Sequence, residues 1–78
     1  MAAEDADELT LLVARASMAD PSIEEAPGRE LAKLALEALA SDPGMDAVDL
    51  ARQLVAAHPE ADVSWINVIA LETSRSAG

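Results

Sequence analysis

Apolar residues recur along this chain at intervals of three and four positions, which is the spacing of one face of an α-helix. Four segments show this pattern, and short clusters of aspartate, serine, proline and glycine separate them. The pattern predicts helices over residues 5–18, 27–40, 46–58 and 62–75. No run of β-branched or aromatic residues and no hairpin signal predicts a strand.

The predicted fold is all-α: a compact four-helix bundle, packed either orthogonally or up-down. We allow for one further short turn of helix at residues 22–25, because Ser-Ile-Glu-Glu has the spacing of a capping box. The chain has no internal repeat, low-complexity segment or long linker. We therefore expect residues 1–78 to form a single domain, with frayed ends at 1–4 and 74–78.

Several acidic residues stand where a helix begins. Asp5 with Glu8, and Asp46 with Asp49, have the spacing at which an aspartate caps the N–H three residues later. Asp62 precedes the last predicted helix in the same way. Helix capping accounts for the positions of these acidic residues, and no catalytic role is needed to explain them. We therefore expect no catalytic carboxylate pair and no cofactor site.

Some large apolar residues fall outside the single stripe that each helix can bury. Leu11 and Met18 lie opposite the apolar stripe of the first predicted helix, and Val68 and Leu71 lie off the main apolar face of the last one. Trp65, the one aromatic residue, is expected in the core with an edge left for a partner. Because exposed apolar patches on small proteins mark contact sites, these five residues form the predicted partner-binding set.

Charge narrows the choice of partner. Fifteen acids against five lysines and arginines give a net charge of −10, which repels phosphate backbones and anionic membranes. We therefore expect a protein partner with a basic surface, and neither direct nucleic-acid binding nor membrane binding. The absence of cysteine excludes disulfides and zinc–thiolate sites and fits a cytoplasmic location.

One group of residues has the chemistry of a metal site. His58, Glu60 and Asp62 supply nitrogen and oxygen ligands, but their spacing is that of neither a zinc-protease helix nor a calcium loop. We interpret them as a helix end, a solvated acid and a cap, and expect no metal. With one histidine and no glycine-rich phosphate loop, the chain is not expected to be an enzyme.

The segment Gly44–Leu50, Gly-Met-Asp-Ala-Val-Asp-Leu, resembles the motif of acyl carrier proteins, which are also small, acidic and helical. In that family a serine directly follows the aspartate and bears the phosphopantetheine arm. Ala47 stands at this position and has no hydroxyl group to modify. The resemblance therefore implies no carrier function for this chain.

These observations predict a small, acidic, non-enzymatic module for protein–protein interaction, such as an adaptor. A homodimer is one version of this prediction. The alternative is an acidic regulator of nucleic-acid-binding proteins, either a DNA mimic or a vestigial helix-turn-helix. Eight of the fifteen acids lie in the first 30 residues, which suggests mimicry.

Overall fold

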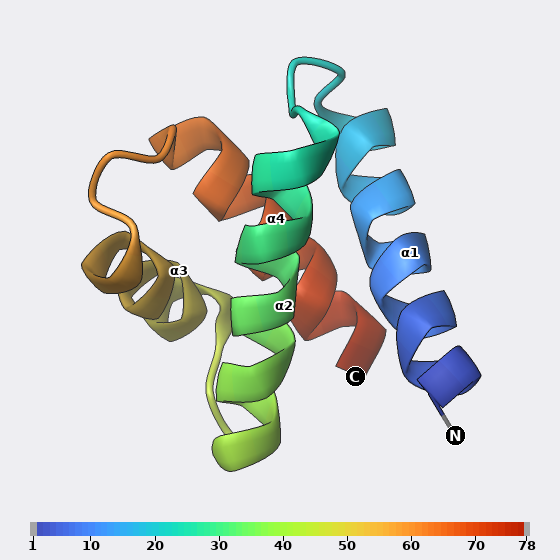
Figure 1. Ribbon diagram of the computed structural model, residues 1–78. Helices are drawn as coiled ribbons and strands as arrows, with labels where there is room; N and C mark the ends of the chain where they lie inside the picture. The colour runs from blue at the N-terminus through green and yellow to red at the C-terminus, as the bar shows by residue number, and fades with distance from the viewer. Residues whose placement is uncertain (1, 78) are drawn as a thin grey trace.

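A computed structural model of this protein describes residues 2–77, with side chains from Glu8 to Arg75. Its elements are four α-helices, and the described residues contain no strand (Figure 1). The all-α, four-helix prediction is therefore confirmed. The helices are α1 (Ala2–Ala19), α2 (Glu25–Ser41), α3 (Ala47–Ala57) and α4 (Val63–Ala77).

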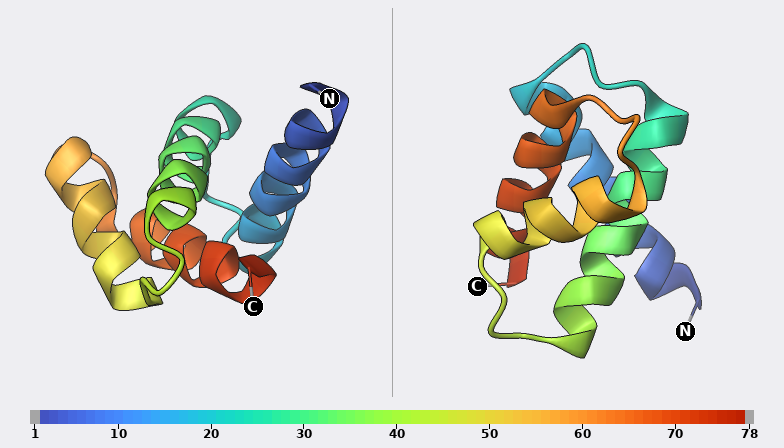
Figure 2. Two further views of the ribbon diagram at one scale, coloured as in Figure 1. Left: turned by 90° about the horizontal axis from the view of Figure 1, so that it is seen from below. Right: turned by 90° about the vertical axis from the view of Figure 1, so that its left-hand side faces the viewer.

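Helices α2 and α4 form the centre of the molecule, because each of them contacts all three other helices. Helix α4 crosses beneath α1 and α2 rather than running beside them, as in an orthogonal bundle (Figure 2, left). Helices α1 and α3 flank this central pair on opposite sides, and within residues 2–77 they do not touch each other. The two flanking helices therefore present two separate outer surfaces.

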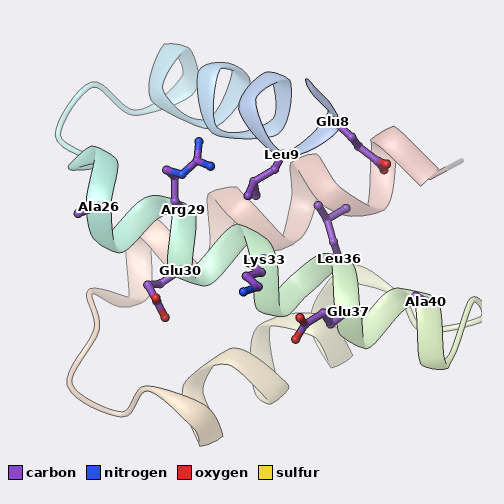
Figure 3. A pocket seen from close by; sticks show the side chains of 9 residues that line it. All are labelled: Glu8, Leu9, Ala26, Arg29, Glu30, Lys33, Leu36, Glu37 and Ala40. Carbon is purple, nitrogen blue, oxygen red and sulfur yellow. The ribbon is translucent and has the colours of Figure 1, made fainter. Parts of the chain in front are cut away.

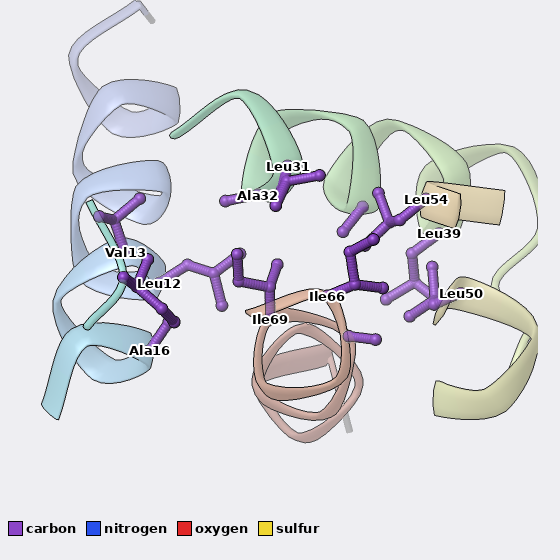
Figure 4. Packing of buried hydrophobic residues seen from close by; sticks show 13 residues of the cluster. Leu12, Val13, Ala16, Leu31, Ala32, Leu39, Leu50, Leu54, Ile66 and Ile69 are labelled. Carbon is purple, nitrogen blue, oxygen red and sulfur yellow. The ribbon is translucent and has the colours of Figure 1, made fainter. Parts of the chain in front are cut away.

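The hydrophobic core follows the predicted stripes and lies between α2 and α4 (Figure 4). On one side, Ile69 of α4 faces the buried Leu12 of α1. On the other side, Ile66 faces the buried Leu50 and Leu54 of α3. Each of these five side chains is at most 2% exposed, so both flanking helices are held by apolar burial.

The start of α2 differs from the prediction. No separate helical turn forms at residues 22–25; α2 begins at Glu25 and its first turn contains Pro27. Proline is tolerated there because the first N–H groups of a helix have no intrahelical acceptor. Gly28 is buried against Ile23, and a Cβ atom at Gly28 would lie 2.9 Å from Ile23 Cγ2. Glycine thus lets the loop pack closely onto the helix that follows it.

Two of the predicted caps are present. Asp46 precedes α3, and its Oδ1 accepts a hydrogen bond from the Asp49 N–H at 2.9 Å. Asp62 precedes α4, and its Oδ1 accepts from the Ser64 N–H at 2.8 Å. The predicted cap at Asp5 is wrong, because α1 begins at Ala2 and Asp5 lies inside it. The Asp5 side chain lies outside the described residues.

Both terminal helices extend further than the sequence pattern indicated. Helix α1 begins at Ala2 rather than Asp5, and α4 continues to Ala77 rather than ending at Arg75. The expected fraying falls partly on residues 1 and 78, which lie outside the described residues, so it remains a prediction.

Candidate functional site

A shallow, open apolar groove lies between α3 and α4. It has a volume of about 590 Å³. Val48 and Val55 on α3 are 60% and 40% exposed, and Leu71 on α4 is 49% exposed. Arg52 is the single charged residue among those that line it. The lining residues are Ala47, Val48, Ala51, Arg52, Val55, Ala56, Asn67 and Leu71.

Of the residues that line this groove, one was predicted as a partner-binding residue. Leu71 belonged to the predicted partner-binding set, whereas Val48 and Val55 did not. The missed signal is the spacing: Val48 and Val55 are seven residues apart and off the stripe that buries Leu50 and Leu54. Leu11 and Met18, which lie opposite the apolar stripe of the first helix, have the same spacing. Val63, at the start of α4, is a further missed residue and is 60% exposed.

Leu11 and Met18 lie on the outer face of α1, as predicted, and are 57% and 83% exposed. They are separated from the α3–α4 groove by the central helices, since α1 and α3 are not in contact within the described residues. Neither residue is among those that line the α3–α4 groove. The predicted set of five residues therefore does not form one surface: Leu11 and Met18 lie on α1, and only Leu71 lines the α3–α4 groove.

Trp65 and Val68 are half-buried and pack against the core. Trp65 Nε1 donates a hydrogen bond to Ser22 Oγ at 3.0 Å, and Ser22 Oγ donates to Asp20 Oδ1 at 2.6 Å. This chain of hydrogen bonds ties the loop between α1 and α2 to α4. The indole therefore stabilises the fold. Part of it remains accessible, as predicted from the sequence.

A larger groove, of about 830 Å³, lies between α1 and α2. Figure 3 shows Leu9 of α1 pointing toward α2 and Arg29 of α2 pointing toward α1. Charges of both signs line this groove, including Glu8, Lys33 and Glu37. An apolar partner in this groove would also cover charged side chains, and covering a charge without a counter-charge is unfavourable. We therefore place the candidate site at the α3–α4 groove.

The residues considered as metal ligands have local partners. His58 ends α3, and its Nδ1 lies 3.2 Å from Glu60 Oε2. The pKa of Glu60 lies below its ordinary value because of a backbone hydrogen bond and, secondarily, the His58 ring. Asp62 caps α4. No group of three histidine or acidic side chains in the described part of the chain is arranged to hold a metal ion.

Turns account for two further acids. Asp20 Oδ1 accepts a hydrogen bond from the Ser22 N–H at 3.1 Å, and Asp42 Oδ1 accepts from the Gly44 N–H at 3.2 Å. Aspartate is favoured in turns because its short side chain can bind a backbone N–H two residues later. Together with the two helix caps, these contacts show that local backbone geometry determines where several of the acids lie.

No helix in the described residues is long and apolar enough to cross a membrane. The protein-family models, the curated proteins and the solved structures that were compared with this chain include no match to it.

Proposed function

We propose that this protein is a protein-interaction module that receives an apolar helix of another protein in the α3–α4 groove. The observation that carries the proposal is the exposure of Val48, Val55 and Leu71 around one concave surface. Burying a valine or leucine side chain stabilises a complex by roughly 1.5–3 kcal/mol relative to leaving it in water. A partner that fills the groove therefore gains from all three residues at once.

The shape of the groove favours a helix as the occupant. Its walls are two packed helices, and the ridges of a third helix fit the channel between two others. The exposed valines lie seven residues apart, which is two turns along α3. A partner helix with apolar residues over the same two turns matches this length.

A different protein is favoured over a second copy of this chain. Each copy carries a net charge of −10, so two copies repel each other as they approach. A partner with a basic surface around its docking helix is attracted instead, and this attraction speeds encounter. We therefore propose a heterologous complex rather than the homodimer.

A crosslinked helical peptide with leucines at positions i, i+4 and i+7, and otherwise neutral polar residues, is a direct probe. Fluorescence anisotropy should show that it binds the full chain. Val48→Asn and Leu71→Glu should each abolish binding, because a polar side chain that is buried without a partner is strongly unfavourable. The matched controls are Leu11→Glu and Met18→Glu, which change exposed apolar residues outside the groove.

The control variants should bind as tightly as the unaltered protein, and circular dichroism should show that all four variants remain folded. Loss of binding in the α1 variants, with binding retained in the α3 and α4 variants, would show that the peptide binds α1 and would contradict the proposal.

A further inference from the structure

Arg52 is the one charged residue that lines the groove, and a positive charge at this position favours a partner with a negative charge opposite it. We propose that the docking helix carries a carboxylate within its apolar stripe, placed to pair with Arg52. This inference rests on the proposed function and specifies the chemistry of the partner at the same site.

Arg52 stands between the two exposed valines, four residues after Val48 and three before Val55. All three side chains therefore lie on one side of α3. A helix that covers the valines also covers Arg52, because it lies between them. The guanidinium is exposed now, so docking moves it from water into contact with the partner.

The described part of the chain places no carboxylate within ion-pair distance of Arg52. Asp49 is three residues earlier on the same helix, but its carboxylate is not paired with the guanidinium. An arginine covered by an apolar partner without a carboxylate loses hydration and gains no counter-charge. A partner aspartate or glutamate replaces that hydration with charge-assisted hydrogen bonds, and an arginine fork can bind both carboxylate oxygens.

The net charge of the chain disfavours a partner with many acidic residues, so we expect the docking helix to carry a single carboxylate opposite Arg52. A strongly acidic partner is repelled by the net charge of −10 before it reaches the groove. The docking helix is therefore neutral or basic elsewhere, with its acid in the apolar stripe. Asn67, on the opposite wall, is polar but uncharged and does not oppose this arrangement.

The test uses the crosslinked peptide with one variable position, i+3, on the same side as its leucines. Three versions carry glutamate, glutamine or lysine at this position. Each is titrated into the unaltered chain, Arg52→Gln and Arg52→Glu, and anisotropy gives the affinity. Asp49→Asn serves as the matched control for a change of one charge on the same helix.

We expect the unaltered protein to bind the glutamate peptide about tenfold more tightly than the lysine peptide. Arg52→Gln should remove this preference, Arg52→Glu should reverse it, and Asp49→Asn should preserve it. Equal binding of the three peptides to the unaltered chain, or an unchanged preference in Arg52→Glu, would overturn the inference and leave the docking groove intact. If no peptide binds any of these chains, the proposed function fails as well.

Discussion

The outer face of α1 and the α3–α4 groove share a sequence pattern but differ in shape. Each has two large apolar residues seven positions apart: Leu11 and Met18 on α1, and Val48 and Val55 on α3. On α1 both residues are exposed on the outer side of the helix, and neither is among those that line the α3–α4 groove. On α3 the pair faces Leu71 of α4 across a groove.

Because of this difference in shape, we propose docking at the groove, where a second helix lies beside the exposed apolar residues. A residue on a convex helix is covered only from one direction, whereas a helix lying in a groove contacts both walls. Met18 is the most exposed of the described large apolar residues, at 83%, but it does not line the α3–α4 groove. Our proposal therefore ranks the two surfaces by shape rather than by exposure.

The largest expected effects separate residues that are adjacent in sequence. Leu12→Ala and Leu54→Ala remove side chains that are at most 2% exposed and should each lower the free energy of unfolding by about 2–5 kcal/mol. Leu11→Ala and Val55→Ala should change it by less than about 0.5 kcal/mol, as surface substitutions do. Urea denaturation measures all four. A large decrease in the free energy of unfolding for Leu11→Ala would show that Leu11 belongs to the core and not to an exposed surface.

Two glycines, one in the first turn of α2 and one in the turn before α3, should respond differently to the same substitution. Gly28→Ala places a Cβ atom 2.9 Å from the buried Ile23 and should destabilise the protein by about 1–3 kcal/mol, despite alanine's higher helix propensity. Gly44→Ala, before α3, meets its nearest atom at 3.6 Å and should be neutral or slightly stabilising. Thermal unfolding compares the two variants. A stabilised Gly28→Ala protein would contradict the close packing of this loop.

The N-terminal ends of α2 and α3 also differ, because only α3 has a side-chain cap. Asp46→Ala removes the side-chain cap of α3 and should lower the free energy of unfolding by about 1 kcal/mol. Glu24 occupies the same position before α2 but makes no capping hydrogen bond, so Glu24→Ala should have almost no effect. Chemical denaturation of both variants checks this contrast. Equal decreases in the free energy of unfolding for the two variants would show that the Asp46 cap does not stabilise the start of α3.

The smallest expected effect depends on pH. The folded-state pKa of Glu60 is lowered from its ordinary value of 4.5, so its stabilising contribution is present above that pH. It is lost as the pH falls below 4.5 through the folded pKa. Glu60→Gln should therefore make the stability of the protein slightly less dependent on pH in the acidic range. Thermal unfolding at several pH values tests this, and an unaltered pH profile would rule out the contribution.

The helices and the core were predictable because each depends on residues close together in sequence. The spacing of Leu50 and Leu54 identifies a buried face, and Asp46 marks the start of α3. The start of α2 was not predictable in the same way, because it depends on the contact of Gly28 with Ile23. The sequence pattern placed Pro27 and Gly28 in the first turn of a helix that begins at Pro27, and the structure extends this helix by two residues, back to Glu25.

The candidate site was only partly predictable because it is formed by two helices. The pattern of α4 shows that Leu71 lies off the main apolar face, but not which residues stand opposite it. The pairing of α3 with α4 places Val48 and Val55 there. Likewise, the sequence shows Arg52 as one cation among five, and only the groove sets it apart from the others.

The most direct test of the account is to map the contact surface by NMR. The neutral apolar helical peptide is titrated into the full chain labelled with nitrogen-15, and shifts of the backbone amide signals are recorded. We predict that the largest shifts occur in residues 47–56 of α3 and in α4 around Asn67 and Leu71. Shifts centred on Leu11 and Met18, or no shifts at all, would contradict the claim that the α3–α4 groove is the docking surface.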